Sequence, residues 1–168
     1  MEVEKTLILS PLQSKQKLDR IAHEIQENFY DNGTLYVVGI ADRGYLVAEI
    51  ITNVLKEICD FDIELVKLTL DKDEPLSSQP ELGVDLSVLK NKSVVLVDDV
   101  LNSGRTLVYA LAHLLKSELR LVKTVTLVDR MHRRYPIRAD YVGLTLSTTL
   151  QEHIAVEFKD SEISVFLK

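Results

Sequence analysis

Cysteine and long apolar runs are scarce in this chain of 168 residues. Because Cys59 is the single cysteine, a disulfide scaffold is impossible, and we expect this thiol to be a buried packing residue at the end of a helix. The longest unbroken apolar run, 107–112, has six residues, whereas a helix that crosses a bilayer needs ~20. The apolar stretch near the N-terminus is too short for a secretory signal. We therefore expect a cytoplasmic protein that does not span a membrane.

Basic residues are also in the minority, with 20 Lys and Arg against 26 Asp and Glu and a net charge of −6. A strongly basic nucleic-acid binder needs a surplus of cations, so that class of protein is disfavoured. The hydrophobic content of 46% argues against disorder. The four histidines fit no metal-binding spacing. No linker, repeat or low-complexity tract interrupts the chain, and residues 1–168 are predicted to form a single domain.

β-Branched runs alternate with segments of helical period, which is typical of βαβ units and a mostly parallel sheet. Ser10 and Pro11 predict the start of a helix, and the cluster 31–33 predicts its end. The segment 71–85 lacks periodicity and is predicted to be a long loop, either a functional lid or a flexible connector. Two more helices are predicted around 47–58 and 107–115, and strands at 35–40, 61–70, 93–97 and 122–128. Three short strands, which we expect to be antiparallel, are predicted at 141–146, 153–158 and 163–167.

The segment most informative about function is 94–107. It predicts a buried strand with two carboxylates, Asp98 and Asp99, at its carboxyl end, then a turn of small residues and the start of a helix. Ligands of open α/β sheets bind beyond the carboxyl ends of the strands. Backbone N–H groups of 103–106, together with the hydroxyls of that turn, form an anion site, and Gly104 lets the backbone approach closely. The segment therefore predicts a phosphate site beside carboxylates that suit sugar hydroxyls or hydrated Mg²⁺.

Other interpretations of this segment are weaker. An acidic pair alone would merely solvate the end of a strand, and a receiver domain has acids at strand ends without the Ser-Gly-Arg-Thr turn of 103–106. Neither a P-loop nor a GxGxxG signature is present. Four apolar residues, two acids, two apolar residues, a variable position and Ser-Gly-Arg-Thr follow one another here. This order resembles the phosphoribosyl-pyrophosphate signature of type I phosphoribosyltransferases.

That resemblance implies both a fold and a site. The fold would be a Rossmann-like α/β fold, with a central, mostly parallel sheet flanked by helices, a small hood and a flexible active-site loop at about 71–85. Asp98 and Asp99 would be catalytic residues that contact the ribose hydroxyls, while Mg²⁺ would be held mainly through the substrate and also by these two carboxylates. The 5′-phosphate would be bound by the turn residues Asn102, Ser103, Gly104, Arg105 and Thr106.

A second segment, 39–44, joins a predicted strand to its helix with the sequence Gly-Ile-Ala-Asp-Arg-Gly. Turns of this kind are common, so its meaning depends on the signature downstream. It resembles the pyrophosphate loop of the same family, in which backbone N–H groups bind the leaving group, and Arg43 would add a catalytic cation. The residues implied are Ile40, Ala41, Asp42, Arg43 and Gly44.

A third segment, 127–143, narrows the family. It resembles the pyrimidine-operon attenuation regulators, which double as uracil phosphoribosyltransferases, and 21–25 is similar to their first helix. The resemblance extends from about residue 20 to the C-terminus. It implies a homodimer or homotetramer with a base site near Asp129, Tyr141 and Val142.

Two positions depart from that pattern. The regulators enter their lid with Leu-Tyr-Arg-Asp-Asp, whereas this chain has Leu-Asp-Lys-Asp-Glu at 70–74, so Lys72 becomes the candidate cation over the pyrophosphate. Asn102 stands where many 6-oxopurine transferases have Asp and the regulators usually have Tyr. An amide does not take up a proton at neutral pH, which excludes base catalysis from this side chain, although it could still orient a base or a ribose oxygen.

A locally basic stretch, 120–138, carries six Lys or Arg and one acid, a net +5. Such a cluster suits RNA, the mouth of a pyrophosphate site or a solvated hairpin. The main functional expectation is transfer of the 5-phosphoribosyl group from phosphoribosyl pyrophosphate to a nucleobase, with uracil favoured and pyrophosphate released. Two alternatives stay open: a nucleotide-sensing, RNA-binding regulator with little catalysis, and a phosphoribosyltransferase for a purine base.

Overall fold

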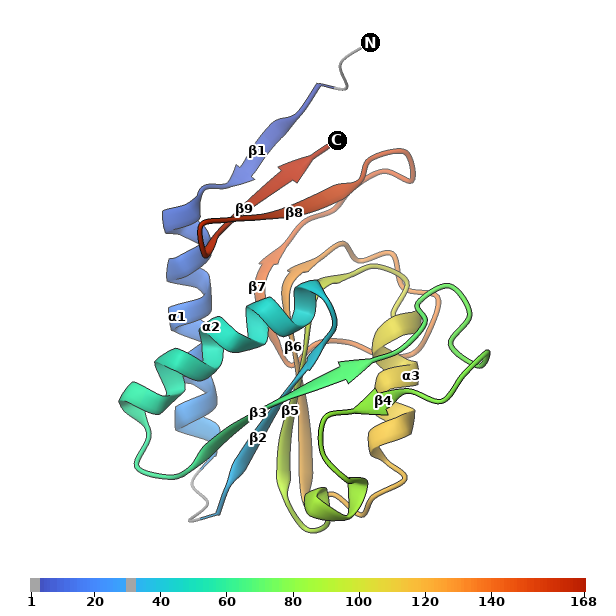
Figure 1. Ribbon diagram of the computed structural model, residues 1–168. Helices are drawn as coiled ribbons and strands as arrows, with labels where there is room; N and C mark the ends of the chain where they lie inside the picture. Colours follow the sequence, from blue (N-terminus) through green and yellow to red (C-terminus); the bar gives the residue numbers. More distant parts are fainter. Residues whose placement is uncertain (1–3, 30–32) are drawn as a thin grey trace.

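The structure, a computed structural model, describes residues 4–29 and 33–168 (Figure 1). Its helices are α1 (Pro11–Asn28), α2 (Arg43–Ile58) and α3 (Arg105–Leu114), with a short 3₁₀ helix at Leu86–Leu89. Its strands are β1 (Thr6–Leu9), β2 (Leu35–Ile40), β3 (Ile63–Thr69), β4 (Glu81–Leu82), β5 (Ser93–Leu101), β6 (Leu121–Asp129), β7 (Tyr141–Thr145), β8 (Ile154–Lys159) and β9 (Glu162–Leu167). Over the described ranges, no helix is both long and apolar enough to cross a membrane.

Helix α1 begins where the sequence predicts. The side chain of Ser10 accepts the N–H of Gln13, and the side chain of Gln13 accepts the N–H of Ser10, which satisfies two of the free amides at the helix start. Phe29 caps the other end. Of the predicted stop at 31–33, residues 31 and 32 lie outside the described part of the chain.

In the described part of the chain, a six-stranded sheet has the order β4-β3-β2-β5-β6-β7. Its strands run parallel except for β4, which is antiparallel to β3. The expectation that 141–146 is antiparallel is therefore wrong. After β6 the chain returns along the sheet, and hydrogen bonds between Asp140 and Thr124 start β7 from the same end as β6.

Helices cover both faces of this sheet (Figure 1): α1 and α2 pack on one face and α3 on the other. Strand β5 alternates between the two cores, since Val95 and Val97 belong to the core under α1 and α2, whereas Val94 and Leu96 belong to the core under α3. All four side chains are fully buried. Burial on both faces explains the continuous apolar run from which this strand was predicted.

A small second sheet, the hood, consists of β1, β9 and β8 in antiparallel order. Figure 1 shows the hood beyond the end of the large sheet to which β7 leads. The antiparallel prediction for 153–158 and 163–167 is thus confirmed. Strands β1 and β4 were not predicted, because two to four residues show too little periodicity, and β4 takes two residues out of the expected loop 71–85.

Cys59 ends α2, where it is partly buried against the core under α1 and α2. Burial is the main cause that raises the pKa of its thiol above the usual value, and the nearby Asp60 acts in the same direction. A thiol with a raised pKa is a poor nucleophile, which agrees with the packing role expected for it.

Candidate active site

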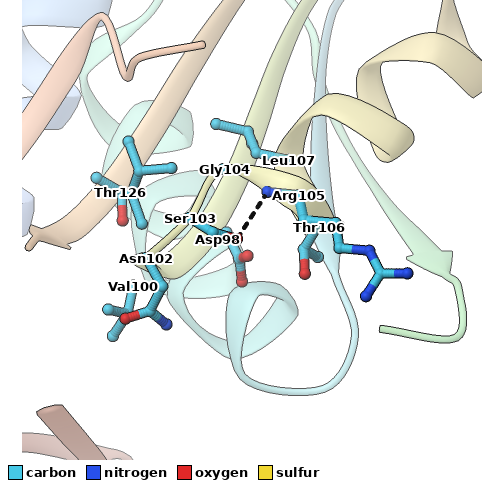
Figure 2. A pocket seen from close by; sticks show the side chains of 10 residues that line it. Asp98, Val100, Asn102, Ser103, Gly104, Arg105, Thr106, Leu107 and Thr126 are labelled. Atoms are coloured by element: carbon cyan, nitrogen blue, oxygen red, sulfur yellow. Dashed lines mark hydrogen bonds between the residues drawn. The ribbon is translucent and has the colours of Figure 1, made fainter. Parts of the chain in front are cut away.

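The carboxyl end of β5 carries Asp98 and Asp99, two residues that are 5% and 8% exposed. The two residues follow each other in the chain, and the carboxylate of Asp99 lies close enough to act on that of Asp98. Asp98 is on the face covered by α3, where Figure 2 shows it beside the turn that leads into this helix. The residues that line this pocket include Asp98 and exclude Asp99.

The pKa of Asp98 is raised to about 8, chiefly by burial and then by the neighbouring carboxylate of Asp99. Lys72 acts in the opposite direction, with its Nζ 3.8 Å from Oδ1 of Asp98. The backbone N–H of Asp99 also donates to Oδ1 of Asp98. Asp98 is therefore harder to ionise than an ordinary aspartate, and a cation placed beside it favours its ionised form.

The turn after β5 is held in one shape by its glycine. Gly104 has φ of 86°, the left-handed region, and a Cβ at this position would come within 2.6 Å of Cγ2 of Ile137. The carbonyl oxygen of Ser103 accepts the N–H of Arg134, while its hydroxyl oxygen accepts the N–H of Arg105. Helix α3 begins at Arg105, so its other first N–H groups have no partner within the helix and are available to an anion.

These elements enclose a pocket (Figure 2). It brings Asp98 together with all five predicted phosphate-binding residues of the turn. Thr126 joins them from β6, where it stands opposite Asp98 in the parallel register. Sequence reasoning missed Thr126, and the only signal for it was a polar residue in a buried apolar run. The lining consists of Asp98, Val100, Leu101, Asn102, Ser103, Gly104, Arg105, Thr106, Leu107 and Thr126.

The segment predicted to bind pyrophosphate packs directly against Asp98. A Cβ on Gly44 would lie 2.9 Å from both Cα and Oδ1 of Asp98 and 2.8 Å from the carbonyl oxygen of Val97. Glycine is therefore required for this close approach of the start of α2 to the end of β5. Asp42 and Arg43 are exposed beside it, and a cis peptide bond joins Ala41 to Asp42. Ile40 is buried in the core under α3.

Arg130, directly after β6, connects the turn to the loop 148–152 that leads to the hood. This residue is 8% exposed. Its guanidinium donates to Oδ1 of Asn102 at 3.0 Å and to Oγ1 of Thr148 at 3.0 Å. It also donates to the carbonyl oxygens of Thr149 and Glu152. In the sequence, Arg130 is one cation of the basic stretch 120–138, and the family resemblance places it with Asp129 near the base.

The three base-site candidates lie apart. Asp129, 3% exposed, already binds the guanidinium of Arg133 and the N–H of Met131. Tyr141 starts β7 and is buried in the core beside α1, while the carbonyl oxygen of Val142 accepts a hydrogen bond from Arg20. None of the three lines the pocket of Asp98.

Comparison with known proteins connects this geometry to a family. A model described as the phosphoribosyl transferase domain matches residues 7–162. The chain is 39% identical to the "Bifunctional protein PyrR" of Clostridium acetobutylicum, with 96% of each chain covered, and 37% identical to that of Actinobacillus succinogenes, with 89% of each covered. The chain belongs to the phosphoribosyl transferase family.

Solved structures show the same fold. The hypoxanthine phosphoribosyltransferase of Trypanosoma cruzi has a TM-score of 0.75 at 16% identity, over 95% of each chain. A hypoxanthine-guanine phosphoribosyltransferase of Bacillus anthracis has a TM-score of 0.72 at 21% identity, over 91% of this chain and 88% of that one. The expected type I α/β fold is confirmed, and so is the enzyme class, a phosphoribosyltransferase and hence a pentosyltransferase.

The donor set of this phosphoribosyltransferase fits Mg²⁺ that arrives with its substrate. Carboxylate oxygen is the ligand that Mg²⁺ prefers, and the cation usually keeps several waters and substrate phosphates. Asp98 offers one buried carboxylate beside the phosphate turn, and its raised pKa marks a position where a cation would be stabilising. Residues 4–29 and 33–168 hold no group of three or more His, Cys, Asp or Glu placed to bind a metal by themselves.

Proposed function

We propose that this phosphoribosyltransferase transfers the 5-phosphoribosyl group from phosphoribosyl pyrophosphate to a nucleobase, with uracil favoured, and releases pyrophosphate. The observation that carries the proposal is the pocket itself. It places one buried carboxylate between a phosphate-binding turn and the start of α2, with a lysine 3.8 Å away. A sugar that carries phosphate at one end and pyrophosphate at the other needs these groups in this order.

Each part of the site has a role in this reaction. The N–H groups and hydroxyls of 103–106 bind the 5-phosphate, Asp98 accepts hydrogen bonds from the ribose hydroxyls, and the segment 40–44 binds pyrophosphate. Asp99, whose carboxylate acts on that of Asp98, contributes the second acid to the ribose site. The bond from C1 to the pyrophosphate oxygen breaks, a bond from C1 to a base nitrogen forms, and the proton of that nitrogen passes to the leaving pyrophosphate or to water. Mg²⁺, when bound, neutralises charge on the leaving pyrophosphate.

Catalysis in this site rests on position and electrostatics, because no side chain acts as a nucleophile in the scheme. The reacting carbon develops positive charge, which the buried carboxylate of Asp98 stabilises once ionised. Lys72 approaches Asp98 from the loop that follows β3. Closure of this loop excludes the water that would hydrolyse the positively charged sugar. Arg43, exposed at the start of α2, adds positive charge for pyrophosphate.

Uracil is favoured because the segment 127–143 resembles the regulators that double as uracil phosphoribosyltransferases. Asn102 argues against a standard hypoxanthine or guanine transferase, since many 6-oxopurine transferases have Asp at this position as a base and an amide does not take up a proton. The fold shared with hypoxanthine transferases keeps a purine base as the competing substrate.

The test is a pyrophosphate-release assay with magnesium phosphoribosyl pyrophosphate and uracil, hypoxanthine, guanine, xanthine, adenine or orotate. We expect turnover with uracil, and its loss when Asp98→Asn and Asp99→Asn are combined. If pyrophosphate is released with a purine base and not with uracil, the purine replaces uracil as the proposed substrate. Failure with all six bases, or full turnover by the double variant, would overturn the proposal.

A nucleotide-sensing regulator that binds RNA is the second candidate, and the basic stretch 120–138 favours it. Arg134 and Arg138 are exposed, whereas Arg130 and Arg133 are engaged within the protein. If RNA is bound here, affinity for a pyrimidine-gene leader RNA falls steeply with salt and is lost in Arg133→Ala with Arg134→Ala. Binding that is undetectable or independent of salt would exclude this function.

We also propose that the chain assembles as a homodimer or homotetramer in the cytoplasm. The support is the resemblance of 127–143 to the regulator family. Sedimentation equilibrium should give two or four times the chain mass of 19.1 kDa. A mass of one chain across the working concentration range would contradict it.

A further inference from the structure

Arg130 is an almost fully buried cation whose hydrogen-bond partners are neutral, and the nearby carboxylate of Glu152 adds an electrostatic interaction. Its guanidinium donates to the Asn102 amide, to the hydroxyl of Thr148 and to the carbonyl oxygens of Thr149 and Glu152. A buried charge is tolerated only when its hydrogen bonds are made, so this set of bonds resists rearrangement. It ties the phosphate turn after β5 to the loop 148–152 before β8.

The bond between Arg130 and Asn102 determines which way the amide faces. A guanidinium donates hydrogen bonds and accepts none, whereas an asparagine amide has one accepting and one donating end. The oxygen must therefore face Arg130, because the reversed amide would set two donors against each other. In Figure 2 the Asn102 side chain stands at the open end of the turn, with its nitrogen on the side of Asp98.

We infer that Arg130 is a positioning residue that holds Asn102 as a hydrogen-bond donor toward the substrate, so that the site prefers a base that presents an acceptor atom there. The acceptor is a ring carbonyl oxygen or an unprotonated ring nitrogen. This inference rests on the proposed function for the place of the base, next to the ribose held by Asp98. A base that turns an N–H toward Asn102 meets a second donor and is disfavoured.

Substitutions can separate this role from a structural one. Asn102→Asp keeps an oxygen for Arg130 but, when ionised, has no hydrogen to donate. Asn102→Ala removes both ends, and Arg130→Lys keeps the charge but lacks the planar fork that serves several acceptors at once. Arg138→Lys is the matched control, since Arg138 is an exposed arginine in the same segment.

The readout is calorimetric affinity for uridine 5′-monophosphate and guanosine 5′-monophosphate, each divided by the affinity for ribose 5-phosphate. This ratio isolates the contribution of the base and does not require turnover. We expect Asn102→Asp, Asn102→Ala and Arg130→Lys each to lower the ratio for the tighter nucleotide about threefold to tenfold, the value of one hydrogen bond. Affinity for ribose 5-phosphate and the Arg138→Lys control should stay at the wild-type level.

A double variant decides whether Arg130 acts through Asn102. Arg130→Lys added to Asn102→Ala should lower the ratio no further, because the group that Arg130 positions is already gone. The inference would be overturned if the effects of Arg130→Lys and Asn102→Ala multiplied, or if Asn102→Asp left the affinity ratio unchanged. A wild-type affinity ratio of one would overturn it as well. If Arg130→Lys does not fold, as judged by thermal unfolding, Asn102→Asp against Asn102→Ala still decides the donor role. If the affinity ratios follow the expected pattern but no base gives pyrophosphate release, the proposed function is refuted and this inference stands.

Discussion

At the scale of single residues, the site depends on one carboxylate that the protein itself does not ionise readily. Asp98 lies at the end of a strand buried on both faces, and burial raises its pKa to about 8. The raised pKa shows that the protein's own groups supply too little positive charge there, which magnesium and the ribose hydroxyls would supply or compensate. Substrate binding and ionisation of Asp98 should therefore be linked.

The first prediction follows from that linkage. Binding of magnesium phosphoribosyl pyrophosphate at pH 7 should release a proton from Asp98, because 7 lies below the raised pKa of about 8. The release should shrink as the pH rises above 8, where Asp98 is already ionised. Calorimetry in buffers of different ionisation enthalpy measures it. Asp98→Asn should lose this release, and equal release by the variant would place the proton elsewhere.

The second prediction concerns Gly44. In Gly44→Ala the new Cβ would meet backbone and carboxylate atoms of Asp98 at 2.9 Å, so the start of α2 or the end of β5 must shift. Displacement of a substrate-positioning element by about 1 Å can cost on the order of 100-fold in rate, and we expect kcat/KM for phosphoribosyl pyrophosphate to fall at least about tenfold. Gly83→Ala is the matched control, because its Cβ finds ordinary contacts of 3.5 Å or more. Wild-type kinetics in Gly44→Ala would contradict the close packing.

At the scale of elements, the loop after β3 brings a cation to the site. Asp71 accepts the N–H groups of Asp73 and Glu74, which orders the beginning of the loop around Lys72. The antiparallel pairing of β4 with β3 returns the chain to the sheet. The loop is therefore held at both ends, and it carries Nζ of Lys72 to within 3.8 Å of Oδ1 of Asp98.

The third prediction tests that cation. Lys72 is 41% exposed, so its interaction with Asp98 is screened by water and worth little in the free protein. Lys72→Met should raise the KM for phosphoribosyl pyrophosphate about twofold to fivefold and raise the pKa of Asp98 further, since an opposing charge is lost. Steady-state kinetics with varied phosphoribosyl pyrophosphate measure the change. Lys90→Met, the same charge change at an exposed position far along the chain, should leave the KM unaltered.

At the scale of the whole molecule, the two cores meet at β5 and the site is built where that strand ends. The hood shares the core under α1 and α2 with the large sheet, and β7 leads from that sheet to the hood (Figure 1). Stability and function compete at this point, because this buried strand ends in Asp98, whose pKa burial raises.

The fourth prediction states that competition as a dependence on pH. The pKa of Asp98 is about 8 in the folded protein, against an ordinary aspartate value of 3.8 that we assign to the unfolded chain, so the folded state binds more protons between these values. The contribution of Asp98 to the free energy of unfolding should therefore fall as the pH rises from about 4 to about 8. Urea unfolding of wild type and Asp98→Asn at pH 5 and pH 8 tests it. The variant should lose less stability over this interval, and identical losses would refute the prediction.

The fold and the turn were predictable because their signals are local. The capping box at Ser10, the apolar run of β5 and the turn at 103–106 are each written in a few adjacent residues, and local backbone geometry follows from them. The same holds for the resemblance to type I phosphoribosyltransferases, which rests on the contiguous segment 94–107. Short strands such as β4 carry too few residues to show a period and were missed.

Tertiary structure decided what is in contact across the chain. The sequence placed Asp98 and Asp99 together, and of the two only Asp98 lines the pocket, while Asp99 acts on its carboxylate from close by. Thr126 enters that pocket through the register of β6, and Arg130 reaches Asn102 across 28 positions. No periodicity or motif encodes such pairs, because they depend on how strands align after the chain has folded back on itself. By itself, then, the sequence determined the chemistry available at the end of β5, and the packing of the sheet determined which groups share it.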